Sequence, residues 1–204
     1  MKPYVLLAAI LAACLVTILE SVPALANPVP PLTNCTVMPQ DTFAYPRIVG
    51  MPTTGPGLQA ARMVVTVLDS SGAPIPDAYV QMVFEPGCTG LCICQSAVLE
   101  GYTNASGVVV LVMALGGCCQ DPAAATLFVL GVPIRVYDTV TSPDLTSPTG
   151  GGDCRVVLAD FSAFGPCLSG GSGGCCDFTG DETAGLADFV VFGAVWGQSC
   201  PSGR

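Results

Sequence analysis

The stretch that decides the fold runs from Met63 to Phe84 and reads MVVTVLDSSGAPIPDAYVQMVF. Its first part, MVVTVLD, is rich in β-branched residues, and its last part, AYVQMVF, alternates apolar and polar residues. Both patterns are typical of β-strands. The residues between them include serine, glycine, proline and aspartate, which favour turns. The segment therefore predicts two neighbouring strands joined by a short connection.

The same pattern continues along the chain. VVVLVMAL at 108–115 follows the turn sequence TNASG at 103–107, and ATLFVLG and VPIRVYD meet at Gly131. No convincing helical period is present between residues 47 and 141. Short strands separated by turns predict an antiparallel β-sandwich, so the chain is expected to be mainly β.

Two segments carry a family resemblance. VTVLDSSGAPIPDAYVQMVF at 65–84 and TNASGVVVLVMAL at 103–115 resemble bacterial immunoglobulin-like and carboxypeptidase-regulatory-like modules. The resemblance implies an Ig-like sandwich over residues 47–141. Modules of this kind usually act as spacers or adhesive units.

The N-terminus resembles an export signal. Basic Lys2 precedes an apolar stretch, 5–19, and the small residues 24–26 (ALA), which predicts a signal peptide cleaved after Ala26. An alternative is a lipoprotein box, LAAC, which would place a lipid on Cys14. Residues 27–46 are rich in proline and are expected to form an extended leader. We expect a secreted or cell-surface protein with no membrane insertion after signal removal.

The composition excludes several functions. The net charge is −9, and Lys2 is the only lysine, which argues against nucleic acid as a partner. There is no histidine, so the usual general base and most activated nucleophile systems are missing. The chain is therefore expected not to be an enzyme.

Cysteines indicate a disulfide framework. Of the 12 cysteines, all except Cys14 follow the predicted cleavage site, and an exported chain of this kind is expected to be disulfide-rich. The pairing stays open. The odd number implies a free thiol, an intermolecular bridge or a different cleavage site. A structural zinc is a further alternative, with ligands drawn from Cys88, Cys92, Cys94 and one of Cys118 and Cys119.

An internal repeat occupies the C-terminal third. DCRVVLADFSAFG at 153–165 aligns with DETAGLADFVVFG at 181–193 at a spacing of 28 residues. The shared pattern, D-x6-D-F-x-x-F-G, predicts an acidic loop followed by an apolar helix in both copies. The aromatic and apolar residues of these helices are expected to pack in a core, even if some of them also face a partner: Phe161, Phe164, Phe189, Phe192, Val195 and Trp196.

The acidic loops have the spacing of a calcium site. Ca²⁺ takes six to eight oxygen ligands, which a twelve-residue loop supplies at alternate positions and at its twelfth residue. In DFTGDETAGLAD at 177–188, Gly185 leaves room for a water ligand. The expected ligands of this second loop are Asp177, Thr179, Asp181, Thr183 and Asp188. The first loop offers Asp144, Asp153 and Asp160, but LTSPTGGG at 145–152 interrupts it. Calcium binding is expected mainly at the second loop.

These loop-helix copies resemble type I dockerin modules over residues 142–204. The resemblance implies a small, α-helical, EF-hand-like module that binds Ca²⁺ and attaches to a cohesin receptor. Three features depart from the family: Thr179 replaces Asn or Asp, Glu182 replaces the turn glycine, and Leu-Ala at 158–159 and 186–187 replaces hydroxyl residues. The expected partner is therefore a cohesin-like domain or the protein's own sandwich.

The sequence thus predicts a secreted, non-catalytic protein whose sandwich carries a calcium-dependent attachment module. One alternative is a self-assembling cell-surface or filament subunit, stiffened by calcium and disulfides, with the odd cysteine linking neighbours. Another alternative is a carbohydrate-binding module that uses a face of the sandwich.

Overall fold

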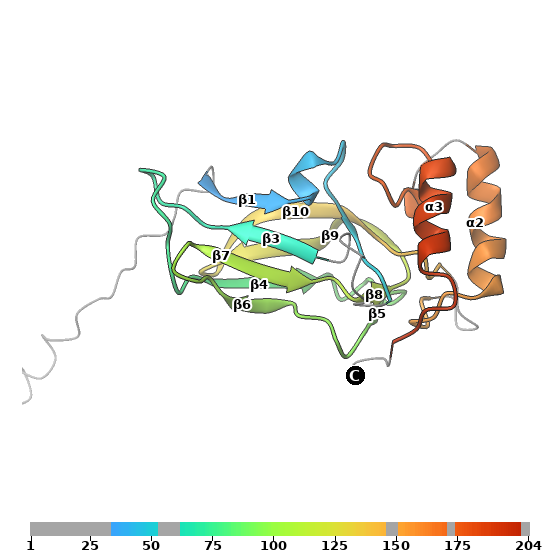
Figure 1. Ribbon diagram of the computed structural model, residues 1–204, viewed down its shortest axis with the longest axis horizontal. Helices are drawn as coiled ribbons and strands as arrows, with labels where there is room; N and C mark the ends of the chain where they lie inside the picture. The colour runs from blue at the N-terminus through green and yellow to red at the C-terminus, as the bar shows by residue number, and fades with distance from the viewer. Residues whose placement is uncertain (1–33, 53–61, 146–150, 171–173, 201–204) are drawn as a thin grey trace, which may run out of the picture.

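The computed structural model describes residues 34–52, 62–145, 151–170 and 174–200. These residues form a mainly β structure with two helices side by side at one end (Figure 1). The predicted signal peptide and the leader up to residue 33 lie outside the described residues, as do the last four residues and part of the first predicted loop. In the part of the chain that is described, no helix has the length and apolar character to cross a membrane.

The elements follow the chain in a simple order. They are β1 (Thr36–Met38), η2 (Gln40–Thr42), β2 (Arg47–Val49), β3 (Arg62–Thr66), β4 (Tyr79–Phe84), β5 (Cys92–Ile93), β6 (Glu100–Tyr102), β7 (Val108–Val112), β8 (Leu115–Gly116), β9 (Cys119–Val129), β10 (Val132–Thr141), α2 (Leu158–Gly170), η4 (Gly174–Cys176) and α3 (Leu186–Ala194).

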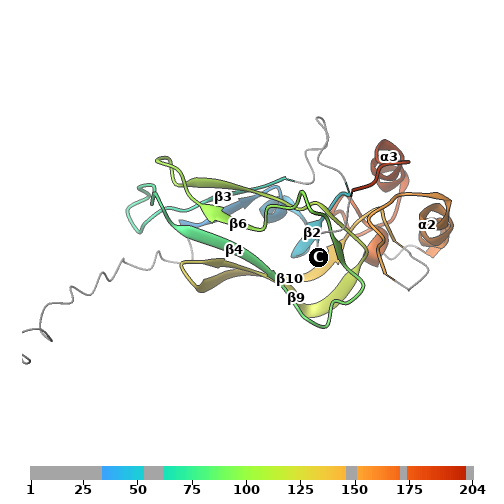
Figure 2. The same ribbon diagram turned by 90° about the horizontal axis from the view of Figure 1, so that it is seen from below.

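The strands form two larger sheets and a small one. The five-stranded sheet has the order β2-β10-β9-β4-β6, the three-stranded sheet β1-β3-β7, and β5 pairs with β8. All of these pairs are antiparallel except β2 with β10. Figure 2 shows β3 and the β9–β10 pair in different layers. Apolar side chains from both sheets fill one core, among them Val65, Leu111, Val80 and Leu127.

The strands predicted from the sequence are confirmed. β3 and β4 lie within MVVTVLD and AYVQMVF, and their buried residues alternate with more exposed ones. In the connection between them, the Asp69 carboxylate accepts hydrogen bonds from the amides of Ser71 and Ala73. Leu130 and Gly131, with φ of 51° and 79°, close the β9–β10 hairpin. Such paired left-handed residues match the twist of a two-residue hairpin turn.

The predicted leader differs from the structure in its second half. β1 pairs with β3, with Val37 opposite Val65, so residues 36–38 belong to the three-stranded sheet. Asp41 holds this segment in place. Its carboxylate accepts a hydrogen bond from the Val37 amide at 2.7 Å and forms an ion pair with Arg135 at 3.0 Å. From Thr36 onward, the segment expected to be an extended leader is therefore folded against the sandwich. A proline-rich sequence gave no sign of a strand this short.

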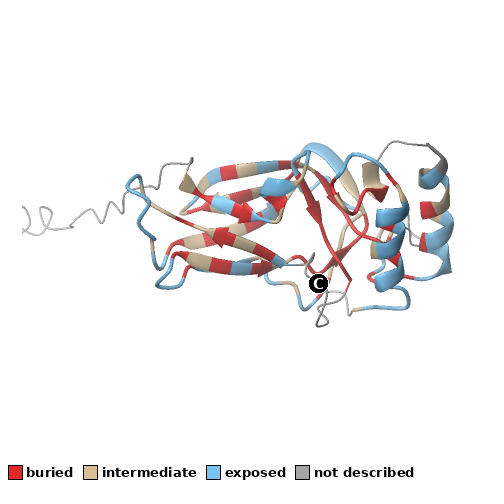
Figure 3. Ribbon diagram, turned by 45° about the horizontal axis from the view of Figure 1, so that its top comes forward, coloured by how far each residue is buried: buried red, intermediate tan, exposed pale blue. Residues whose placement is uncertain are grey.

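The two helices share a second core with the sandwich. Val49, the last residue of β2, and Met51, just after this strand, are buried with Val156, Phe164 and Phe192 from the helical part. Figure 3 shows buried residues along the strands and on part of each helix, while the rest of the helix surface is exposed. The helical module therefore packs against the sandwich through apolar side chains.

Disulfides cross the predicted boundary at residue 141. The five bridges are Cys88–Cys119, Cys92–Cys154, Cys94–Cys200, Cys118–Cys175 and Cys167–Cys176. Three of them join the sandwich to the helical module. The zinc interpretation is wrong, because all of its candidate cysteines are oxidised in these pairs. Five disulfides are typical of an oxidising, extracellular environment.

The odd thiol is Cys35, and it is buried in the core of the sandwich. Only 1% of this residue is exposed, and its burial raises the pKa of the thiol. A buried, protonated thiol is a poor nucleophile. The predicted role of the odd cysteine as a covalent link between neighbours therefore conflicts with its position.

Candidate functional site

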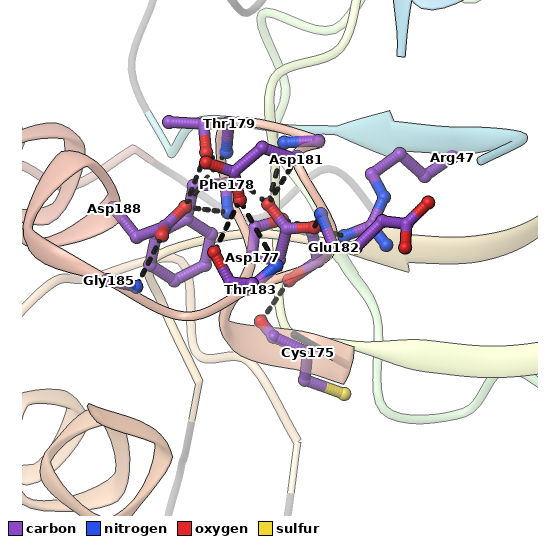
Figure 4. Close-up of polar contacts among 12 residues, drawn as sticks. Arg47, Cys175, Asp177, Phe178, Thr179, Asp181, Glu182, Thr183, Gly185 and Asp188 are labelled. Atoms are coloured by element: carbon purple, nitrogen blue, oxygen red, sulfur yellow. Dashed lines mark hydrogen bonds and ion pairs between the residues drawn. The ribbon is translucent and has the colours of Figure 1, made fainter. Parts of the chain in front are cut away.

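Three aspartates converge in the second acidic loop, at the start of α3. One carboxylate oxygen from each of Asp177, Asp181 and Asp188 lies within 4.8 Å of the others. Asp177 and Asp188 are fully buried, whereas Asp181 is exposed. Figure 4 shows the three side chains gathered over the same loop. The structure thus brings together the three acidic residues that the sequence selected for this loop.

Asp177 organises the turn of the loop. Its Oδ1 atom accepts hydrogen bonds from the amides of Gly180 at 2.6 Å and Asp181 at 3.2 Å. Its Oδ2 atom accepts one from the amide of Glu182 at 2.8 Å. The chain therefore folds around the carboxylate of the first loop residue.

Asp188 joins the two ends of the loop. Its Oδ1 atom accepts hydrogen bonds from the amides of Phe178 at 2.6 Å and Thr179 at 2.9 Å. Its Oδ2 atom accepts one from the amide of Gly185 at 2.8 Å, just before α3. The same side chain thus satisfies a free amide at the helix start and fixes the beginning of the loop.

The hydroxyl groups of Thr179 and Thr183 contact the carboxylates of the loop aspartates. The Thr179 hydroxyl lies 3.1 Å from Asp188 Oδ1, and the Thr183 hydroxyl donates to Asp181 Oδ1 at 2.9 Å. The Thr183 contacts hold the pKa of Asp181 below its ordinary value. The loop is therefore rich in oxygen atoms within a small volume.

Glu182 and Cys154 hold equivalent, unusual backbone positions. Glu182 has φ of 77° and Cys154 has φ of 63°, in the left-handed region that glycine adopts most easily. They are 28 residues apart, so they match in the repeat. An EF-hand loop has a glycine at this sixth position for its sharp turn. Both loops make the turn without that glycine.

The first loop reproduces the hydrogen bonds of the second. The Asp144 carboxylate accepts the amides of Asp153 at 3.2 Å and Cys154 at 2.6 Å, as Asp177 accepts those of Asp181 and Glu182. The repeat seen in the sequence is therefore a repeat of structure.

Asp160 plays the part of Asp188 in this first copy. It accepts the amide of Leu145 at 3.0 Å and, at the start of α2, the amide of Val157 at 2.7 Å. Both helices thus begin with an aspartate that also holds the start of its loop.

The first loop does not gather its three carboxylates as the second does. Asp144, Asp153 and Asp160 do not form a group whose carboxylate oxygens all lie within 4.8 Å of one another. Asp144 is fully buried against Gly116, where an added Cβ would lie 1.9 Å from Asp144 Oδ2. Burial raises the pKa of the Asp144 carboxyl to about 7, against the opposing hydrogen bonds from Asp153 and Cys154. The insertion leaves this loop longer and more closely packed against β8.

Arg47 is the member of the site that the sequence did not reveal. Its Nη1 atom lies 2.9 Å from Asp177 Oδ2 and donates to the Asp177 carbonyl at 2.9 Å. The arginine is 4% exposed and sits on β2, 130 residues away in the chain. It neutralises part of the loop's charge and ties the loop to the sandwich. No local pattern identifies such a partner.

The helix surface away from the sandwich carries the remaining aromatic residues. Phe164, Phe192 and Val195 are buried as predicted, but Phe161, Phe189 and Trp196 are 40%, 39% and 48% exposed. The expected core packing therefore holds for Phe164, Phe192 and Val195, whereas Phe161, Phe189 and Trp196 are partly exposed to solvent. The helices pack one face against the sandwich and leave the opposite face in solvent. The repeat places apolar residues on both faces.

The candidate site therefore has two parts, an acidic loop beneath α3 and an apolar helix surface beside it. The loop offers hard oxygen atoms of the kind that bind Ca²⁺. The apolar surface is of the kind that binds other proteins. No protein-family model, curated protein or solved structure matches this chain.

Proposed function

We propose that this is a secreted, non-catalytic protein in which an Ig-like sandwich carries a calcium-dependent, dockerin-like attachment module. The observation that carries the proposal is the convergence of Asp177, Asp181 and Asp188 in one loop. The second loop is the proposed calcium site, with Thr179 and Thr183 as further oxygen ligands. The first loop, with Asp144, Asp153 and Asp160, serves as a structural copy.

Charge supports calcium as the ligand. Three carboxylates converge, one of them, Asp177, pairs with Arg47, and two of them are fully buried. Like charges held this closely repel one another, and burial increases the repulsion. A divalent cation would remove that repulsion and stabilise the loop and α3. Its oxygen-only surroundings favour Ca²⁺ over softer metals.

The attachment function is supported by the apolar surface of the helices. Their part of the chain supplies many of the exposed large apolar side chains: Val157, Leu158, Phe161, Leu168, Leu186, Phe189, Val190 and Trp196. A concentration of this kind marks protein interaction sites. The opposite face of the helices already packs on the protein's own sandwich. We therefore assign the outer surface to an external protein partner.

A thermal-shift titration of the oxidised protein with Ca²⁺ tests the metal part of the proposal. We expect millimolar Ca²⁺ to raise the melting temperature and chelator to reverse the rise. Asp181→Asn should abolish most of the effect, because it removes a charge from the cluster.

Asp69→Asn is the matched control. Asp69 is a half-buried aspartate that bonds amides and a hydroxyl of its own turn, as Asp181 does, but it lies outside the acidic cluster. This variant should keep the full calcium response. Equal melting curves in chelator and in millimolar Ca²⁺ for the unmodified protein would disprove the proposal.

A further inference from the structure

An apolar groove runs between the two helices on the surface away from the sandwich. Its volume is about 430 Å³, and its lining contains no charged residue: Leu158, Phe161, Phe189, Phe192, Gly193 and Trp196. Four of these six side chains are aromatic. The groove combines residues from the start of α2 and the end of α3, so it exists only when the module is folded.

The aromatic rings stand at steep angles to one another. The ring of Phe161 lies 6.2 Å from that of Phe189 and 6.1 Å from that of Trp196, with interplanar angles of 64° and 84°. Rings at these distances and angles pack edge to face, so they form an uneven aromatic surface rather than a flat stack. Aromatic grooves of this kind bind proline-rich segments, whose extended form is set before binding.

The chain has a segment with matching chemistry directly before its first described residue. Residues 27–33 read NPVPPLT, with three prolines and no charged side chain. Such a sequence favours the polyproline II conformation, so little conformational entropy is lost when it binds. The absence of charge also suits the groove, because the chain as a whole carries −9. An acidic segment would be repelled.

The segment is attached to the first described residue, Asn34, which lies far from the groove. The Asn34 amide donates to the Asp69 carbonyl in the β3–β4 connection, at the end of the sandwich opposite the helices (Figure 1). The length of β9 gives the distance between these two ends. At the far end, the amide of Leu130, which follows β9, bonds the carbonyl of Tyr79. At the other end, β9 begins at Cys119, beside the Cys118–Cys175 bridge to the helical module. Its 11 residues span about 36 Å.

Residues 27–33 are therefore too short to reach the groove of their own molecule. Seven residues in polyproline II extend about 22 Å, well short of the length of β9. The groove of a second copy has no such limit.

We infer that residues 27–33 of one copy bind the aromatic groove of the next copy, joining molecules head to tail. The inference rests on the proposed attachment function and names its partner. The contact is heterologous, because it joins two different surfaces. Repetition of such a contact produces open chains or closed rings.

Trp196 provides a direct test, since it is the only tryptophan in the chain and lines the groove. A variant that lacks residues 27–33, with Ca²⁺ present, is titrated with the synthetic peptide NPVPPLTN. We expect a saturable change in tryptophan fluorescence. Phe161→Ala should weaken binding at least tenfold. Leu168→Ala, an exposed apolar residue of α2 outside the groove, should not affect it.

Sedimentation velocity of the unmodified exported chain tests the assembly. We expect oligomers that grow with concentration, and their loss on deletion of 27–33, on Phe161→Ala or on addition of the peptide. A control peptide with alanine in place of all three prolines should neither bind nor dissociate the oligomers. Equal self-association with and without 27–33, or no fluorescence change at millimolar peptide, would refute the inference.

Chelator separates this inference from the proposed function. A calcium-dependent melting temperature without peptide binding leaves the attachment module standing and refutes the head-to-tail contact. Peptide binding that survives chelator supports the contact and contradicts the calcium dependence of attachment.

Discussion

Glu182 shows how much a single backbone angle matters in this protein. Its left-handed conformation costs roughly 1 kcal/mol relative to glycine, because its Cβ crowds the backbone. The turn keeps this conformation because the Asp177 carboxylate binds the Glu182 amide and the amides of the two residues before it. The equivalent Cys154 cannot be exchanged freely, since it forms a disulfide with Cys92.

Glu182→Gly is therefore expected to stabilise the protein. We expect a gain of about 0.5–1 kcal/mol in the free energy of unfolding, since glycine adopts this backbone angle without strain. Urea denaturation of both proteins in chelator measures it. Glu85→Gly serves as the control, because Glu85 is also exposed but is not left-handed. The variant also removes the side-chain hydrogen bond between Glu182 and Tyr45, so a loss of stability larger than that of one exposed hydrogen bond would show that the turn carries no strain.

Arg47 and Asp177 form a buried ion pair, and its contribution to stability requires both partners. Arg47→Met should destabilise the protein by about 3 kcal/mol, because it leaves a buried carboxylate without its cation. Arg135→Met removes the partly exposed pair with Asp41 and should cost about 1 kcal/mol or less. Equilibrium unfolding in chelator compares the two. Equal losses would mean that burial does not strengthen the Arg47 pair.

At the scale of elements, each helix is tied to its loop by one aspartate. Asp160 and Asp188 accept amides at the helix start and at the start of the loop, so the helix and the loop form together. Single helices of this length are marginal in water, and tertiary contacts supply most of their stability. The insertion in the first loop changes its length but leaves this connection intact.

Asp160→Ala and Asp188→Ala separate the structural role of these residues from the proposed metal role. In chelator, each variant should lose about 2–3 kcal/mol of stability, because amides that are buried or partly buried lose their acceptors. In Ca²⁺, Asp160→Ala should keep the rise in melting temperature, whereas Asp188→Ala should lose it. If Asp160→Ala abolishes the calcium response as well, the site lies in both loops.

On the scale of the whole molecule, the sandwich and the helical module are joined by covalent bonds and by a shared core. Three disulfides join them, and Val49 and Met51 lie in a core with residues of both helices. A dockerin on a flexible linker would be an independent domain. Here the module caps one end of the sandwich.

Thermal unfolding of the oxidised protein should therefore follow a single transition. Circular dichroism at a β-sheet wavelength and fluorescence of Trp196, which lies in the helical module, should give the same midpoint. Coincident curves from two probes are the test of two-state unfolding. Two midpoints would show that the module unfolds separately in spite of its bridges.

Cys35 should be unreactive in the folded protein. Because its thiol is buried and its pKa is raised, a thiol reagent should label the native protein only slowly and should label one cysteine after unfolding. Non-reducing electrophoresis of the exported protein should show a monomer. A ladder of covalent oligomers would contradict this and would favour a disulfide-linked assembly.

The sequence by itself determined β3, β4, β7, β9 and β10, the two helices and the three aspartates of the second loop. These features follow from local patterns, since the period of a strand or helix and the spacing of a loop are written in neighbouring residues. The repeat was also readable, and it led to equivalent hydrogen bonds in both copies.

Only the tertiary structure decided the disulfide pairs, the partner of Asp177, the place of β1 and the exposure of Phe161, Phe189 and Trp196. Each of these depends on segments that are far apart in the chain and meet only after folding. Arg47, on β2, is 130 residues from the carboxylate that it neutralises. Apolar helix residues look alike in sequence whether they face the sandwich or the solvent, because the periodicity of a helix does not state which neighbour covers it.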